Sequence, residues 1–237
     1  MLYKDNHPPI KRTPSENHVI IVGTSADFPP FSYLDANKKP IGFDIDVVNE
    51  VAHRIGKKIA LHNLEFDALL TELAFGKLDI VAAGMSATPE RAKRVFFTQP
   101  YLRTPFVVVT LAANPISSLD DIDNKPVIVN EGYTADTFMS TRKHAQLVRL
   151  PSISDAFLAL NNGQAFAFVT AENTVKSFFS QYGKDKYSIY RIPHHEETNS
   201  LVIAKDKPEL LALVQQALDS MEKDGTLESL KKKWGLS

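Results

Sequence analysis

The chain has 237 residues, of which 43% are hydrophobic and 23% are charged, and its formal net charge is -1. This composition is that of an ordinary globular protein, and the length suits one large domain or two small ones. A near-neutral charge without a Lys- or Arg-rich run argues against nucleic-acid binding. No apolar run approaches the ~18 residues of a membrane span. The absence of cysteine excludes disulfides, thiol catalysis and Cys-ligated zinc.

The first residues differ in character from the rest of the chain. Residues 1–18, "MLYKDNHPPIKRTPSENH", are polar and rich in proline, and they lack the apolar core of a signal peptide. We expect a flexible leader here, with the folded part beginning near Val19.

Strands and helices should alternate in the first third of the chain. In order, we expect a strand in "HVIIVGT", a helix capped by Asp44 and stopped by Gly56, a strand in "KIALHNL", a helix capped by Asp67 and stopped by Gly76, and a strand in "LDIVAAG". This alternation predicts an α/β sheet of parallel strands with right-handed connections.

A second unit of the same plan follows the long apolar run "TPFVVVTLAANP". It contains a strand, a glycine turn and a helix in "SSLDDIDNKPVIVNEGYTADTFM", then a helix and a strand in "SISDAFLALNNGQAFAFVTA". A strand in "NSLVIAKD" could belong to either unit, and two helices are expected at Pro208–Lys223 and Thr226–Trp234. If that strand returns to the first unit, two strands cross between lobes, and a hinged cleft lies at the carboxyl ends of both sheets.

Aromatic residues stand on the loop after the first strand, "GTSADFPPFSY". Phe28 and Phe31 either pack against the prolines of the loop or form an aromatic wall for a flat or cationic ligand. Ser25 is a candidate for a polar contact, and Asp27 is either a second such contact or a turn former.

Arg91 lies in the first turn of a short helix that Thr88 should cap, with Pro89 at its first position. A cation is unfavourable at a helix N-terminus unless an anion is bound there. Together with Ser86 and free backbone N–H groups, Arg91 would suit a carboxylate. The alternative is a solvated arginine beside Lys93 and Arg94.

Two further candidates follow strand ends in the second unit. In "NEGYTADTF", Thr134 begins a helix and could hold the same carboxylate, while Asn130 could point into the cleft. In "FVTAEN", Glu172 could pair with an ammonium group or could be an ordinary surface glutamate at a helix start.

Other chemistry is poorly supported. The "HHEE" stretch at residues 194–197 lacks the spacing of two ligands on one helix face, and we interpret it as a polar loop. There is no phosphate-binding glycine motif, and no nucleophile is grouped with a base. We therefore predict no catalytic residues, no metal and no cofactor.

Several stretches together resemble a known family. They are "GTSADFPPFSYLDANKKPIGFDIDVVNEVAHRIG", "FDALLTELAFGKLDIVAAGMSATPERAKRVFFTQPY", "VIVNEGYTAD" and "MEKDGTLESLKKKWG". They are similar to the polar amino-acid solute-binding proteins of ABC importers, above all the arginine and lysine/arginine/ornithine binders. The resemblance implies a type II periplasmic-binding-protein fold. Its first lobe would comprise residues 19–108 and 201–237, and its second lobe residues 109–200.

The resemblance also implies roles for individual residues. Arg91 would grip the α-carboxylate of an amino acid, helped by Ser86 and Thr134. The Gly84 backbone would meet the α-amino group, and we place the adjacent Met85 among the ligand-binding residues. Phe28 and Phe66 would sandwich the ligand side chain.

The chain departs from the family pattern at two positions. Ser25 stands where the lysine/arginine/ornithine binders usually have an aspartate, and Asp27 with Asn130 would take over its role. The ammonium-binding aspartate of lobe two aligns with Ala171, so a one-residue shift would bring in Glu172.

Two apposed aromatic faces suit a planar guanidinium. We therefore expect arginine as the ligand, with lysine, ornithine, histidine and glutamine as alternatives. The implied protein is a monomer that delivers its amino acid to a membrane permease from the periplasm or outer face of the membrane, after removal of a signal peptide and possible lipid anchoring. The alternative functions are a dehydratase resembling the cyclohexadienyl dehydratases and a sensory or adhesive surface protein.

Overall fold

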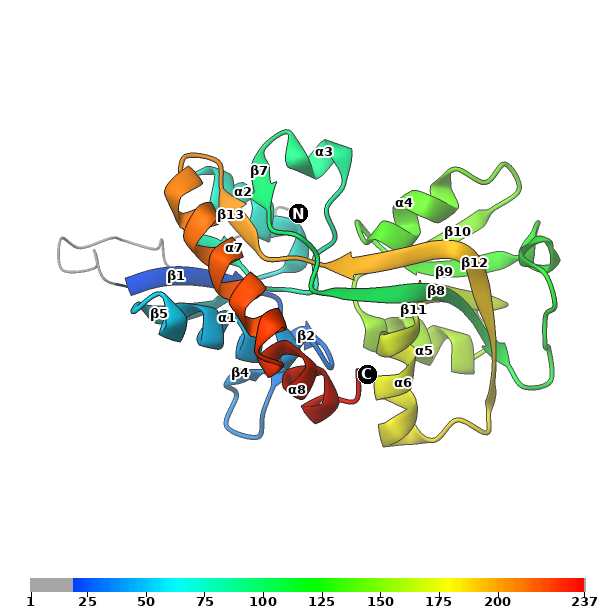
Figure 1. Ribbon diagram of the computed structural model, residues 1–237. Helices are drawn as coiled ribbons and strands as arrows, with labels where there is room; N and C mark the ends of the chain where they lie inside the picture. Colours follow the sequence, from blue (N-terminus) through cyan, green and yellow to red (C-terminus); the bar gives the residue numbers. More distant parts are fainter. Residues whose placement is uncertain (1–18, 237) are drawn as a thin grey trace.

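The computed structural model describes residues 19–236, which form two α/β lobes lying side by side (Figure 1). The long strands β8 (Leu102–Leu111) and β12 (Tyr187–Asn199) extend from the junction of the lobes through the second lobe. The two-lobed α/β fold predicted from the sequence is confirmed. The leader expected at residues 1–18 lies outside the described residues.

The first lobe is built on a sheet of order β5-β1-β6-β13-β7. Its strands are β1 (Val19–Thr24), β5 (Lys58–Asn63), β6 (Ile80–Val81), β7 (Val95–Phe97) and β13 (Val202–Ala204). Strand β1 is parallel to β5 and β6, whereas β13 is antiparallel to β6 and β7. The strand expected in "NSLVIAKD", which could have joined either unit, therefore belongs to lobe one.

Helices of lobe one cover this sheet, and two of them come from the C-terminal part of the chain. They are α1 (Phe43–Arg54), η2 (Phe66–Ala68), α2 (Leu69–Ala74), α3 (Pro89–Ala92), α7 (Pro208–Lys223) and α8 (Thr226–Lys233). The aromatic loop folds into a small antiparallel sheet of β2 (Asp27–Phe28), β3 (Ser32–Leu34) and β4 (Pro40–Ile41).

The second lobe has a sheet of order β10-β9-β11-β8-β12. Its remaining elements are η3 (Leu119–Ile122), β9 (Pro126–Asn130), α4 (Thr134–Ser140), β10 (Gln146–Leu150), α5 (Ile153–Asn161), β11 (Ala167–Ala171) and α6 (Glu172–Tyr182). Strand β8 pairs antiparallel with β12 from Leu102 to Leu111 and with β11 from Phe106 to Thr110. We therefore propose that lobe two begins at β8, earlier than the boundary at residue 109 expected from the sequence.

Two short segments connect the lobes, and they are hydrogen-bonded to each other. The Thr98 N–H donates to Leu201 O at 3.0 Å, and the Tyr101 N–H donates to Asn199 O at 2.9 Å. The Leu201 N–H in turn donates to the Thr98 hydroxyl at 3.0 Å. The hinge is thus a paired two-segment connection.

Three local expectations differ from the structure. Neither Asp44 nor Asp67 caps a helix: α1 follows Gly42, η2 follows Glu65, and neither has a side-chain cap. The polar loop expected at residues 194–197 is part of β12, the edge strand of the second sheet, next to a register shift between Arg191 and Glu196.

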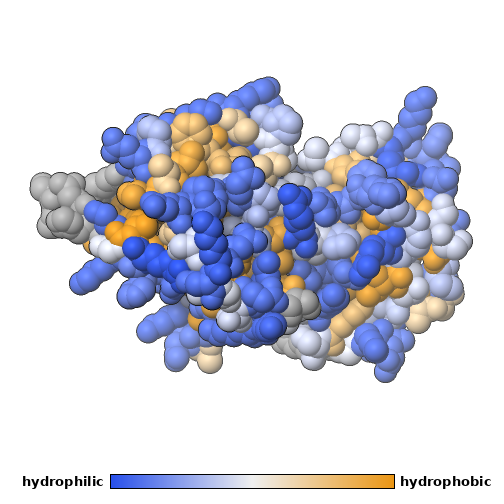
Figure 2. Space-filling model, in the orientation of Figure 1, coloured by the Kyte–Doolittle hydropathy of each residue, from blue (hydrophilic) through white to orange (hydrophobic). Residues whose placement is uncertain are grey.

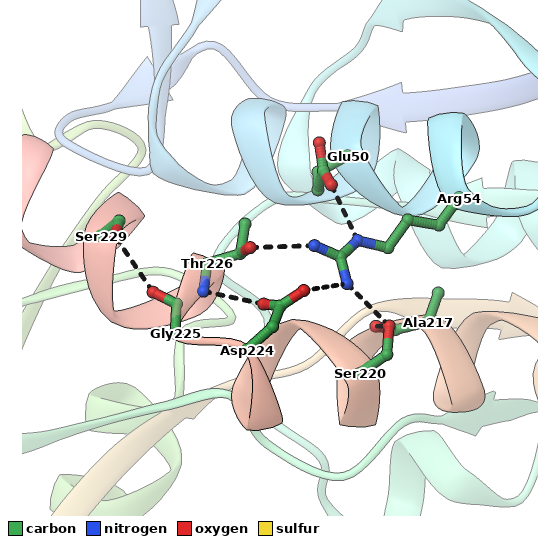
Figure 3. Close-up of polar contacts among 8 residues, drawn as sticks. All are labelled: Glu50, Arg54, Ala217, Ser220, Asp224, Gly225, Thr226 and Ser229. Carbon is green, nitrogen blue, oxygen red and sulfur yellow. Dashed lines mark hydrogen bonds and ion pairs between the residues drawn. The ribbon is translucent and has the colours of Figure 1, made fainter.

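The C-terminal helices are fastened to α1 by the network around Arg54 (Figure 3). Its guanidinium pairs with Glu50 at 2.7 Å and Asp224 at 2.8 Å, and it donates to Ser220 at 2.8 Å and Thr226 at 2.9 Å. One side chain thereby holds the α7–α8 turn against the first helix of the chain.

Figure 2 shows that hydrophilic side chains cover most of the visible face, with hydrophobic ones in separate patches. Apolar side chains bury both faces of each sheet, as expected for strands flanked by helices. Among residues 19–236, no helix combines the length and apolar character that crossing a membrane requires.

Candidate functional site

Arg91 reaches from lobe one across to lobe two. It lies in α3, where the Arg91 N–H donates to the capping Thr88 hydroxyl at 3.2 Å and Pro89 occupies the first turn, as predicted. Its Nη1 donates to Ser86 O and its Nη2 to Gly132 O, both at 2.9 Å. Burial lowers the pKa of this guanidinium, but an arginine stays charged in proteins. A half-buried cation therefore stands between the lobes.

Glu197 supplies a buried carboxylate near this cation. It lies on β12 with 6% exposure, and its Oε1 accepts the Thr134 hydroxyl at 2.6 Å. Burial raises the pKa of Glu197 to about 7, although the Thr134 hydroxyl and the charge of Arg91 both lower it. The site therefore contains a guanidinium that stays charged and a carboxyl group whose pKa burial raises to about 7.

Ser86 links Arg91 to strand β12, which carries Glu197. Its hydroxyl donates to Thr198 O at 2.7 Å and accepts from the Thr198 N–H at 3.0 Å. Thr198 adjoins Glu197, and the Ser86 carbonyl accepts from Arg91. A closed ring of contacts thus joins lobe one, β12 and lobe two. Its members are Ser86, Arg91, Gly132, Thr134, Glu197 and Thr198.

Three aromatic side chains, those of Phe28, Phe66 and Tyr133, form an aromatic group beside these contacts. Tyr133 of lobe two lies 4.7 Å from the Phe66 centroid and 5.4 Å from the Phe28 centroid. The Arg91 guanidinium carbon is 5.7 Å from the Phe66 centroid. Burial, and then the nearby carboxylates of Asp27, Glu197 and Glu65, raise the pKa of the Tyr133 hydroxyl. An aromatic surface with acidic groups around it suits a cationic side chain.

Gly84 lies against the aromatic group with φ 62°. A Cβ at this position would lie 2.9 Å from Phe28 Cε1, so the close approach requires glycine. The Gly84 N–H donates to Asp44, which also accepts from Asn199 Nδ2 at 3.1 Å. Burial raises the pKa of Asp44 to about 6, although these two hydrogen bonds lower it. Asp44 positions the site rather than capping its helix.

Residues 20–237 match the family described as bacterial extracellular solute-binding proteins, family 3. The chain belongs to this family.

Relatives of this family-3 protein carry names that state amino-acid binding. It is 30% identical over 217 residues to the "Probable histidine-binding protein" of Campylobacter jejuni, covering 91% of this chain and 84% of the relative. It is 30% identical over 220 residues to the "Arginine-binding extracellular protein ArtP" of Bacillus subtilis, covering 91% and 85%. It also superposes on "An ancestral arginine-binding protein bound to arginine" with TM-score 0.83, 32% identity, and coverage of 92% and 98%.

The structure brings together most of the residues singled out in the sequence of this family-3 protein. Ser86, Arg91 and Thr134 belong to the closed ring of contacts, whereas Phe28 and Phe66 flank Tyr133.

The flanking residues of this group are also placed near it. The Ser25 hydroxyl donates to Asp27 Oδ1 at 3.1 Å, and Met85 is buried, its carbonyl accepting from the Ser200 N–H at 3.0 Å. Asn130 is buried at the end of β9: its Nδ2 donates to Leu150 O at 3.2 Å, and its Oδ1 has no protein partner in the described part of the chain.

Glu172 has ionic partners of its own. Arg191 contacts both of its carboxylate oxygens, at 2.6 and 2.8 Å, and Lys176 lies 3.7 Å away. These partners neutralise the carboxylate, and it contacts neither Arg91 nor Ser86.

Sequence reasoning missed Tyr133, Asp44 and Glu197 as site residues. Asp44 was assigned to a helix cap, and Glu197 was included in the "HHEE" loop. The signal available for Glu197 was the alternation of a strand, which places Glu196 outward and Glu197 inward. In the described residues, no group of acidic and histidine side chains could hold a metal ion.

Proposed function

We propose that this protein is the substrate-binding component of an amino-acid ABC importer and that it captures arginine between its lobes. The observation that carries the proposal is the half-buried Arg91 guanidinium, which contacts Ser86 of lobe one and Gly132 of lobe two. These contacts use two of its five N–H donors, which leaves donors for a carboxylate. A ligand held there would favour the closed arrangement of the lobes.

The α-carboxylate binds Arg91 beside Ser86 and Thr134, and the Gly84 carbonyl, with Met85 next to it, faces the α-amino group. The Gly84 N–H is unsuitable for this role because it already donates to Asp44. The ligand side chain contacts the aromatic group of Phe28, Tyr133 and Phe66 rather than Phe28 and Phe66 alone.

A basic side chain is favoured because acidic groups surround the aromatic group. Asp27, Glu65 and Glu197 all raise the pKa of Tyr133, so their charges act on the same space. Ser25, through its hydrogen bond with Asp27, and the unpartnered Asn130 Oδ1 offer further acceptors for the N–H groups of a guanidinium. Lysine, ornithine, histidine and glutamine are the competing ligands.

The protein acts as a monomer outside the membrane, where it delivers the amino acid to a permease, and it has no catalytic role. The curated relatives above are named as binding proteins, which supports this assignment over a dehydratase on the same fold.

Thermal unfolding against a panel of amino acids tests the proposal after ligand carried from the host has been removed by partial unfolding and refolding. Arginine at ~100 times its dissociation constant should add about 2.7 kcal/mol to the free energy of unfolding. Smaller shifts with lysine and ornithine support the proposed preference. No shift with any amino acid refutes the function, and a dehydratase assay would follow.

A further inference from the structure

Glu197 is a buried carboxylate with few partners. Its side chain has one hydrogen bond, from the Thr134 hydroxyl, and it forms no ion pair within the residues that the structure describes. A carboxylate has about four lone-pair sites, so most of its acceptor capacity is unused. Burial of an unpaired carboxylate is costly, and a bound cation removes that cost.

The place of Glu197 in the site suits one particular cation. Glu197 is adjacent to Thr198, whose backbone is bonded to Ser86, and Ser86 O accepts from Arg91. The guanidinium and the carboxylate are therefore held by one continuous set of contacts. An α-amino acid carries a carboxylate and an ammonium group on the same carbon. Its binding site therefore needs a positive group for the carboxylate and a negative group for the ammonium, side by side.

Two other acidic side chains that are at least half-buried, Glu172 and Asp44, already have partners of their own. Arg191 and Lys176 neutralise Glu172, and Ala171 before it has no charge. Asp44 already accepts hydrogen bonds from Gly84 and Asn199. Of these three carboxylates, Glu197 has the fewest partners.

We propose that Glu197, on the hinge strand β12, binds the α-ammonium group of the ligand. This inference rests on the proposed function and adds the residue that distinguishes an α-amino acid from a simple carboxylic acid. Thr134 is the positioning residue, since its hydroxyl holds Oε1 in place from lobe two.

The test compares L-arginine with 5-guanidinopentanoate, which keeps the guanidinium and the carboxylate but lacks the α-ammonium group. Calorimetric titrations are made on the wild type, Glu197→Gln and two controls. Glu196→Gln alters the exposed neighbour that pairs with Arg103 at 2.7 Å, and Glu172→Gln alters the rival carboxylate. Thermal melts of each variant confirm that it is folded.

The wild type should bind arginine at least tenfold more tightly than 5-guanidinopentanoate. In Glu197→Gln the affinity for arginine should fall at least tenfold, while affinity for the analogue is unchanged or higher. Glu196→Gln and Glu172→Gln should keep the wild-type ratio between the affinities for arginine and for 5-guanidinopentanoate. If Glu197→Gln fails to fold, Glu197→Asp keeps the charge and shortens the side chain, and it should weaken arginine while sparing the analogue.

Three results overturn the inference. One is an arginine affinity of Glu197→Gln that equals that of the wild type, and another is an equal loss of affinity for both ligands, which indicates a structural role. The third is that Glu172→Gln no longer prefers arginine to 5-guanidinopentanoate. In each case the wild type still binds arginine, so the proposed function survives. A wild type that binds no arginine refutes the proposed ligand, and the assignment of Glu197 falls with it.

Discussion

Replacing Glu197 by glutamine should change how the stability of the unliganded protein depends on pH. Burial raises the pKa of Glu197 from 4.5 to about 7, because the charged form is poorly solvated inside the site. Between these two values the folded protein binds more protons than the unfolded chain. Stability is therefore lost as the pH rises through this window.

The magnitude follows from the width of that window. Each pH unit between the unfolded and folded pKa values costs about 1.4 kcal/mol, so the full effect approaches about 3 kcal/mol. Glutamine has nearly the same shape, keeps an oxygen for the Thr134 hydroxyl and carries no charge. Glu197→Gln should thus be more stable than the wild type by a few kcal/mol at pH 8, and by little near pH 5.

The assay is urea unfolding of ligand-free wild type, Glu197→Gln and Glu196→Gln from pH 5 to pH 8. Asp44, whose pKa burial raises to about 6, faces the same site and contributes a similar slope to all three proteins. Arg91 stays charged throughout. The difference between wild type and Glu197→Gln therefore reports Glu197 together with its repulsion from Asp44, which also raises the pKa of Glu197, and Glu196→Gln should follow the wild type. Parallel curves for wild type and Glu197→Gln would refute the reasoning.

Four other substitutions test the site and the fold. Arg91→Ala should weaken arginine binding by several kcal/mol in calorimetry, because a buried carboxylate loses its charged partner; affinity within threefold of wild type removes Arg91 from the site. Phe66→Ala should cost about 1–3 kcal/mol of binding, through lost stacking. An unchanged dissociation constant would assign that ring to the core. Gly84→Ala should lower the free energy of unfolding by more than Gly163→Ala does. Both positions have positive φ, which costs about 1–2 kcal/mol, but only at Gly84 would the added Cβ lie 2.9 Å from Phe28 Cε1. Equal losses would mean that the contact relaxes freely. Arg54→Met should increase amide exchange around the α7–α8 turn, and unchanged protection there would show that packing alone holds these helices.

The sequence predicted well those features that depend on neighbouring residues. Thr88 and Pro89 define the start of α3 through short-range hydrogen bonding and a fixed φ angle, and the structure confirms both. The strand–helix alternation of each lobe likewise follows from local hydrophobic periodicity.

The unpredicted features depend on contacts between distant residues. Asp44 was a reasonable helix cap, yet Gly84 and Asn199 make it a buried acceptor. Strand β12 is an edge strand with a register shift, so its exposed polar residues resemble a loop. Tyr133 meets Phe66 only because two lobes approach each other, which no local pattern encodes.

The hydrogen bonds within the hinge restrict the geometry of lobe motion. Thr98 is hydrogen-bonded to Leu201, and Tyr101 is hydrogen-bonded to Asn199, so the two connecting segments must bend together. Paired segments of this kind define a single rotation axis, and displacement grows with distance from that axis. Spin labels placed one in each lobe should therefore report one common angle, whichever pair is chosen. A pair placed across β8 and β12 should keep its separation whether or not ligand is bound.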